Sequence, residues 1–231
     1  MSNEVLFILF LLFLLSLNLV AFRLGKVYMF VLIAVYSLVM NIFVLKSFML
    51  FGFAVTGGNA LYGAVFLLTD MLNEHHSKKD AMKAVGVGFV TVLVFVIATQ
   101  VLIAFSPNEF DWASESINTL FSLAPRILFG SLLAYAIAQP LDVYLFNAIK
   151  KKTKEKYLFL RNNGSTLISQ LVDTLVFTAV GLTGFAFLPF EGIIPTEIFW
   201  EVAIATYVIK LIVALIDTPF IYLSHKIKKG S

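Results

Sequence analysis

The sequence contains no cysteine and few charged residues: Asp, Glu, Lys and Arg together make up 13% of its 231 residues. The lack of cysteine excludes a disulfide framework, a thiolate metal site and a cysteine nucleophile. Soluble domains average about 25% charged residues, and a soluble fold with 60% hydrophobic residues could not cover its apolar surface. The composition therefore indicates an integral membrane protein. The net charge of +3 is attributed to basic loops at one membrane face rather than to nucleic-acid binding.

Seven stretches are apolar over roughly the 20 residues that a membrane-spanning helix needs. They cover residues 4–22, 27–50, 57–74, 82–105, 124–148, 165–188 and 198–224. The first differs from a secretory signal peptide, because Glu4 precedes the apolar run and Arg23 and Lys26 follow it. We expect it to be retained. The predicted fold class is an all-α membrane protein, a bundle of about seven transmembrane helices forming one domain over 1–231.

Basic residues are concentrated in alternate loops, which predicts the orientation in the membrane. Fourteen of the 17 Lys and Arg residues follow the first, third, fifth and seventh spans, whereas the loops between carry acidic residues such as Glu109, Asp111 and Glu191. Basic loops stay in the cytoplasm, so we expect a multi-pass protein of the inner (plasma) membrane with its N-terminus outside and its C-terminus cytoplasmic. The longest loop, 106–123, has apolar residues at spacings that predict a short amphipathic helix on the outer surface.

Ionisable side chains occur inside the predicted spans, where they are costly and usually face the bundle interior or a wet cavity. They are Asp70, Asp142, Asp173, Lys210 and Asp217, with Arg126 near an outer end. A rise of 1.5 Å per residue puts the four carboxylates roughly 12–18 Å from the basic loops and the lysine at about 24 Å. Four helices thus contribute acids to one layer, with a lysine above it.

Further polar residues share helix faces with these acids. Glu74 is one turn after Asp70, Gln139 is three residues before Asp142, and Asn163, Gln170 and Asp173 form a stripe on one face. Two interpretations stay open. The residues either join helices by hydrogen bonds and ion pairs, for example Asp173 with Lys210, or together line a polar cavity. Four acids exceed what one lysine neutralises, which favours the cavity.

Enzymatic and channel functions have little support in these residues. Glu74-His75-His76 lacks the His spacing of a zinc helix, and the two imidazoles point about 100° apart. No catalytic Ser-His pair or intramembrane protease motif accompanies Asp173 and Asp217, and no pore-lining rings are evident. We therefore expect no catalytic residues, no metal site and no cofactor. Carboxylates, amides and aromatic rings suit a polar, flat small molecule.

Several motifs resemble those of one family, the queuosine precursor transporters, also called the vitamin uptake transporters. Thr69-Asp70 with Glu74 resembles its T-D-x-x-x-E element, and Arg126 followed by Gln139-Pro140-Leu141-Asp142-Val143 resembles R…Q-x-x-D-V. The R-N-x-x-S-T…S-Q-x-x-D-T signature is similar to Arg161-Asn162-Asn163-Gly164-Ser165-Thr166 with Ser169-Gln170-Leu171-Val172-Asp173-Thr174, and K…D-T-P to Lys210 with Asp217-Thr218-Pro219. The likeness covers about 27–225.

The resemblance implies an importer of 7-deazaguanine bases, such as queuine and its cyano and aminomethyl precursors. It implies a six-helix core over 27–225, similar to the substrate-binding components of energy-coupling-factor transporters, with 4–22 as an additional N-terminal helix. It also implies that no dedicated ATPase is needed. The candidate substrate-binding residues are Asp70, Glu74, Arg126, Gln139, Asp142, Asn163, Ser169, Gln170, Asp173, Lys210 and Asp217. The expected partners are this small molecule and the lipid bilayer, with no nucleic acid; the sequence does not define an oligomeric state.

Two alternatives remain at this stage. One keeps the transporter but changes the solute to another vitamin or a purine. The other is an intramembrane enzyme or an assembly subunit that transports nothing.

Overall fold

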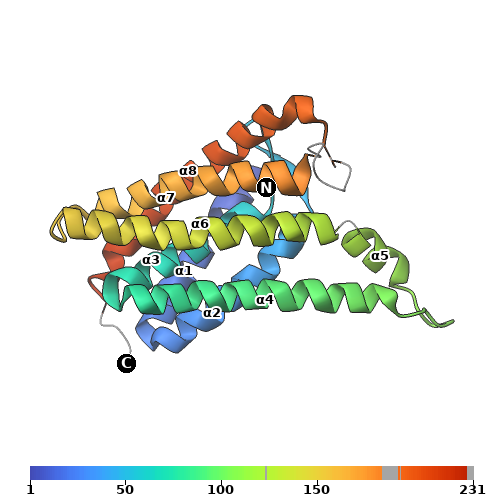
Figure 1. Ribbon diagram of the computed structural model, residues 1–231, viewed down its shortest axis with the longest axis horizontal. Coiled ribbons are helices and arrows are strands. Elements are labelled where there is room, and N and C mark those ends of the chain that lie inside the picture. Colours follow the sequence, from blue (N-terminus) through green and yellow to red (C-terminus); the bar gives the residue numbers. More distant parts are fainter. Residues whose placement is uncertain (123, 184–191, 193, 228–231) are drawn as a thin grey trace.

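The computed structural model describes residues 1–122, 124–183, 192 and 194–227, which form a bundle of long helices (Figure 1). The long helices in this part of the chain are α1 (Asn3–Leu24), α2 (Lys26–Phe43), α3 (Gly58–His75), α4 (Lys78–Ala104), α6 (Ala124–Lys152), α7 (Leu158–Phe177) and α8 (Phe199–Ser224). The predicted all-α membrane bundle is confirmed. The predicted end of the sixth span at 188, Glu191, Lys228 and Lys229 lie outside the described residues.

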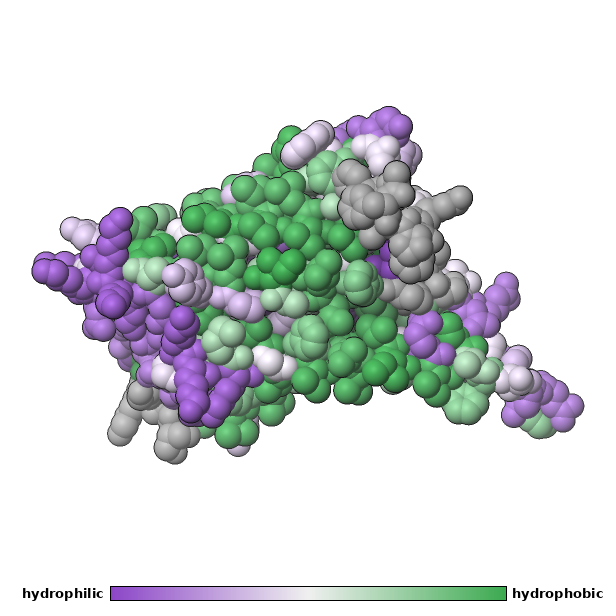
Figure 2. All heavy atoms as spheres, viewed as in Figure 1, coloured by the Kyte–Doolittle hydropathy of each residue, from purple (hydrophilic) through white to green (hydrophobic). Residues whose placement is uncertain are grey.

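A broad apolar band separates two polar ends of the molecule (Figure 2). Six of the described helices are long and apolar enough to cross a membrane, namely all the long helices except α3. Residues 58–73 of α3 are all buried. Because its neighbours shield α3 from lipid, it carries polar residues such as Asn59, Asp70 and Asn73 without exposing them.

One end of the bundle, here called the basic end, gathers the turns that join α1 to α2, α3 to α4 and α6 to α7, together with the end of α8. These segments contain most of the lysines. The turn between α6 and α7 forms the left tip of the molecule in Figure 1, and the same region is strongly hydrophilic in Figure 2. The basic loops that the sequence predicted to share one membrane face thus lie together.

A β-hairpin replaces the last third of the predicted second span. The prediction ran this helix to residue 50, but α2 ends at Phe43, and β1 (Ser47–Leu50) pairs antiparallel with β2 (Phe53–Thr56). The two turn residues, Phe51 and Gly52, have φ values of 51° and 82°, as a tight two-residue hairpin requires. The prediction was wrong because a continuous apolar run does not distinguish a buried strand from a helix.

The predicted amphipathic helix is present as α5 (Ser114–Ser122) at the end opposite the basic end (Figure 1). The Asp111 carboxylate caps it by accepting hydrogen bonds from Ser114 Oγ at 2.6 Å and from the backbone N–H groups of Ala113 and Ser114. These bonds lower the pKa of Asp111 below its usual value, and the bond from the Ser114 hydroxyl contributes most to that shift. The ring of Trp112, just before α5, is almost fully exposed.

Glycine allows a close backbone approach at the junction of α6 and the π-helical turn η1 (Thr178–Leu182) that follows α7. A Cβ added at Gly130 would lie 2.5 Å from the Cα of Gly181, so the two backbones touch. Close packing of small residues is a main source of helix association in membranes. This contact fixes η1 against α6 near one wall of the site described next.

Candidate functional site

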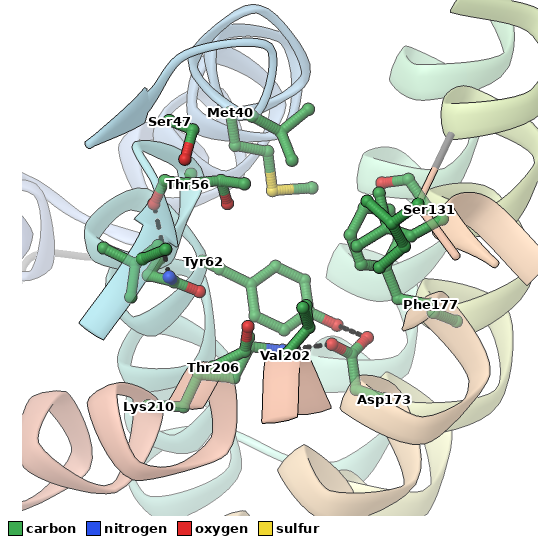
Figure 3. Close-up of a pocket in the computed structure, with 18 of the residues that line it drawn as sticks. Met40, Ser47, Thr56, Tyr62, Ser131, Asp173, Phe177, Val202, Thr206 and Lys210 are labelled. Atoms are coloured by element: carbon green, nitrogen blue, oxygen red, sulfur yellow. Dashed lines mark hydrogen bonds and ion pairs between the residues drawn. The ribbon is translucent and has the colours of Figure 1, made fainter. Parts of the chain in front are cut away.

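A cavity of about 350 Å³ lies between the helices in the half of the bundle away from the basic end. Its walls come from α2, the β-hairpin, α3, α6, α7, η1, the 3₁₀ turn η2 (Thr196–Ile198) and α8. Apolar side chains such as Met40, Phe177 and Val202 line most of it, and Ser47, Thr56, Ser131 and Thr206 add polar groups (Figure 3). Such a mixture of apolar walls with a few polar groups is typical of small-molecule sites.

Charged groups from two helices meet at the floor of the cavity. Asp173 of α7 forms an ion pair with Lys210 of α8 through one carboxylate oxygen. The other oxygen accepts a hydrogen bond from the hydroxyl of Tyr62 of α3. Figure 3 shows the Tyr62 hydroxyl and the Lys210 amino group both pointing to the Asp173 carboxylate. We call Tyr62, Asp173 and Lys210 the floor triad.

The floor triad is almost completely shielded from water. Its three residues are 4–8% exposed, and the Lys210 ammonium lies 4.6 Å from the centre of the Tyr62 ring. Ion pairing and the aromatic face compensate the loss of hydration that burial costs the lysine. The triad therefore presents a carboxylate acceptor, an ammonium donor and a phenol side by side, at the bottom of an apolar pocket.

Among the predicted site residues, Asp173 and Lys210 line this cavity and the others do not. The structure brings Asp70 and Asp142 together between α3 and α6, both fully buried. Ser169 of α7 donates a 2.8 Å hydrogen bond to Asp142 Oδ1. Gln139 accepts a weak hydrogen bond of 3.4 Å from Thr69.

The predicted polar residues nearer the start of α7 join α7 to α8. Asp217 accepts a hydrogen bond of 3.3 Å from Asn162, and Asn163 donates one of 2.8 Å to Thr218. Gln170 is buried, and its side-chain oxygen has no hydrogen-bond partner among the described residues. The polar stripe predicted on α7 is therefore an interior face that contacts α8 and α6.

Glu74 belongs to a cluster at the basic end. Its carboxylate receives two hydrogen bonds from Arg161 of α7, at 2.5 and 2.9 Å, and lies 3.2 Å from Lys150 of α6. His225, just after α8, approaches it to 3.4 Å. One side chain thus ties the ends of α3, α6 and α7 to the segment after α8, and closes the bundle on the side opposite the cavity.

Arg126 is buried at the other end of α6. It donates hydrogen bonds to the carbonyl oxygens of Val180 at 3.2 Å and Thr183 at 2.6 Å. These carbonyls belong to η1 and the residue after it, whose regular hydrogen-bonding pattern ends there. Arg126 therefore holds the cavity wall formed by η1.

Sequence reasoning missed Tyr62 and the hairpin residues of the cavity. A tyrosine in an apolar segment is usually packed for its ring, so it gives no distinct signal. The available signal was position, because Tyr62 precedes Thr69 by seven residues and so shares a helix face with a polar residue next to Asp70.

Most of the chain matches the model of a known protein family. The family model described as "Putative vitamin uptake transporter" matches residues 56–224, from the end of β2 to the end of α8. The chain belongs to the vitamin uptake transporter family. The match includes the whole floor triad, and the resemblance found in the sequence is confirmed.

The relatives of this vitamin uptake transporter carry more specific names. It is 40% identical over 203 residues to the "Probable queuosine precursor transporter" of Bacillus subtilis, covering 87% of this chain and 85% of that protein. It is 25% identical over 171 residues to the "Queuosine precursor transporter" of Escherichia coli, covering 71% and 70%. The "Probable queuosine precursor transporter" of Haemophilus influenzae is 26% identical over 166 residues, covering 72% of this chain and 66% of that protein. No solved structure matches the chain.

Proposed function

We propose that this protein is a membrane transporter of queuosine precursors, the 7-deazaguanine bases, and that the cavity above the floor triad binds the base. The names of its relatives support the solute class. Because the family is one of transporters, we infer that the solute crosses chemically unchanged.

The observation that carries the proposal is the placement of Asp173 and Lys210 at the end of an apolar pocket. A deazaguanine offers an adjacent ring N–H and exocyclic amine, which pair with a carboxylate, and a ring carbonyl, which accepts from an ammonium. Phe177 and Met40 supply flat or polarizable contacts for the ring faces. We infer that the base forms hydrogen bonds with Asp173 and Lys210 while these two residues remain paired with each other.

The orientation follows from the charge distribution. Basic segments remain cytoplasmic, so we infer that the basic end faces the cytoplasm, with the N-terminus outside and the C-terminus inside the plasma membrane. The cavity then belongs to the outer half of the bundle, which fits import. In this scheme residues 27–225 form the transporting core and 4–22 an additional helix.

We assign direct contact with the base to Asp173 and Lys210, and add Tyr62. Nine further residues stay predicted substrate-binding residues without a place in this cavity: Asp70, Glu74, Arg126, Gln139, Asp142, Asn163, Ser169, Gln170 and Asp217.

Binding by the purified protein tests the proposal. A panel of cyano- and aminomethyl-deazaguanine, queuine, guanine and unrelated vitamins is scored by thermal shift, because a true ligand raises stability with its concentration. We expect deazaguanines to stabilise the wild type and not Asp173→Asn. Asp80→Asn is the matched control, since Asp80 also pairs with a lysine, Lys26 at 3.1 Å, but outside the cavity.

The results separate the candidate solutes. Stabilisation by another vitamin or a purine alone would reject the deazaguanine assignment and keep the transporter. Equal stabilisation of wild type and Asp173→Asn by deazaguanines would reject the assigned site.

A further inference from the structure

Two buried carboxyl groups below the cavity lie within interaction distance of each other. Asp70 of α3 and Asp142 of α6 are at most 1% exposed, and each side chain interacts with the other. A carboxylate only accepts hydrogen bonds, so a hydrogen bond can join two carboxyl groups only when one of them carries a proton. Two acids this close do not both ionise.

No cation neutralises this pair within the described part of the chain. Among the buried acids there, Asp173 pairs with Lys210 and Glu74 with Arg161, whereas Asp70, Asp142 and Asp217 form no ion pair. Asp217 accepts a hydrogen bond from Asn162 of α7 instead. The described residues also contain no group of three or more His, Asp or Glu side chains able to hold a metal ion. The ligand that fits the pair is therefore a proton.

A separate observation indicates that the pair is open to a polar ligand. Gln139, three residues before Asp142 on α6, is fully buried, and its side-chain N–H₂ has no acceptor among the described residues. One oxygen of Asp70 and one of Asp142 likewise have no donor there. Donor and acceptors left unpaired next to each other suit a water molecule, and water delivers and removes protons.

The pair lies between the floor triad and the basic end. Ser169 donates to Asp142 and is one helical turn before Asp173 on α7, so one face of α7 contacts both sites. The acids nearest the pair are Asp217 of α8 and Glu74 of α3, and Tyr62 of the floor triad lies near Asp142. A change of charge at the pair therefore alters the electrostatic potential at the substrate site.

We propose that Asp70 and Asp142 form the proton-binding site of a proton-coupled importer, in which one proton enters with each base. The inference rests on the proposed transport function and adds its energy source. A proton from water on the cavity side binds a carboxylate oxygen of the pair, and the same O–H bond breaks on release to water at the basic end. No other bond changes, and the proton is the only co-reactant.

Infrared spectroscopy tests the shared proton without relying on transport. We expect the wild type minus Asp70→Asn/Asp142→Asn difference spectrum at neutral pH to contain the C=O band of a protonated carboxyl group, shifted in D₂O. The control is Asp173→Asn, which removes an ion-paired carboxylate and leaves that band unchanged. A difference spectrum with carboxylate bands alone would overturn the proposal.

Proteoliposomes test the coupling, with labelled cyano-deazaguanine as a neutral probe and the membrane potential clamped. One unit of inward pH gradient can drive about tenfold accumulation at one proton per base. We expect the wild type to approach this value and to take up protons as the base enters, whereas Asp142→Asn should at most equilibrate the base. If Asp142→Asn does not fold, the wild type alone provides the test. Adding base outside the liposomes should then acidify their interior, because a proton enters with each base.

Each outcome decides one question. Accumulation that ignores the pH gradient, follows a sodium gradient, or persists in Asp142→Asn would overturn proton coupling. A wild type that neither exchanges nor binds the base would instead overturn the proposed function and coupling with it, while the infrared spectrum still reports whether the pair holds a proton.

Discussion

The ammonium of Lys210 lies 4.6 Å from the centre of the Tyr62 ring and pairs with Asp173 at the same time. Three helices, α3, α7 and α8, therefore meet at one buried point. Removing Asp173 or Lys210 leaves the other without the opposite charge that compensates its burial.

The ion pair gives the first prediction. Lys210→Met should lower the free energy of unfolding by about 3–5 kcal/mol, because it leaves the buried Asp173 carboxylate uncompensated. Adding Asp173→Asn should recover much of the loss. Thermal or denaturant unfolding in detergent measures both.

The control for this experiment is Lys26→Met. The Lys26 and Asp80 side chains are 38% and 17% exposed, and a pair this accessible contributes about 1 kcal/mol or less. Equal losses for the two lysine variants would contradict the account of the floor triad.

The phenol of Tyr62 gives the second prediction. Tyr62→Phe removes the hydroxyl that Asp173 accepts from, and a hydrogen bond to a charged group is worth about 1.5–3 kcal/mol. We expect weaker base binding, by roughly tenfold or more, measured by titration of the purified protein. Tyr36→Phe is the matched control, because Tyr36 is a buried tyrosine bonded to the Leu14 carbonyl outside the cavity. Similar affinities for all three proteins would argue against Tyr62 in the site.

The glycine contact between α6 and η1 gives the third prediction. Gly130→Ala puts a Cβ 2.5 Å from the Gly181 Cα, and backbone cannot move aside as a flexible side chain can. We expect a destabilisation of about 1–3 kcal/mol. Gly86→Ala should instead stabilise by up to about 1 kcal/mol, since Gly86 is in α4 with open space around it. The melting temperatures of the two variants should thus move in opposite directions.

The cluster around Glu74 gives the fourth prediction. Glu74→Gln removes the charge that holds Arg161, Lys150 and His225 together, so the basic end should open more readily. The protein has no cysteine, which allows a single Ser165→Cys, fully buried on α7, to report access. We expect faster thiol labelling from the basic end in Glu74→Gln than in Glu201→Gln, an exposed acid in the first turn of α8. Unchanged labelling would mean that the cluster does not close this end.

Helix existence was predictable from the sequence, and helix limits were less so. Apolar length identified all seven long helices, since about 20 apolar residues have few alternatives in a membrane protein. The second span was drawn too long because residues 44–56 are as apolar as a helix, and only the turn geometry at Phe51-Gly52 separates the strands. The π-helical turn at the end of α7 could not be predicted, because apolar length does not distinguish a π-helix from an α-helix.

The site was predictable in part. Asp173 and Lys210 were identified because they are ionisable residues inside apolar spans. Such residues are rare in a membrane and usually face the interior of the bundle. The estimated depths of these two residues along their helices differ by about 6 Å, yet their side chains touch, since rise per residue ignores side-chain reach and helix tilt. The same estimate placed Asp70, Asp142 and Asp217 in one layer with Asp173. In the structure Asp70 and Asp142 lie together between α3 and α6, Asp217 contacts Asn162, and Asp173 lines the cavity.

The pairing of Asp173 with Lys210 also determines what kind of guest the pocket distinguishes. The two groups cancel in net charge, so the pocket exerts little long-range pull on anions or cations. The patch is instead amphoteric, because it offers both a carboxylate acceptor and an ammonium donor. It should bind most tightly a rigid molecule whose donors and acceptors alternate along one edge. Discrimination at such a patch depends on the pattern of that edge and not on overall ionic state.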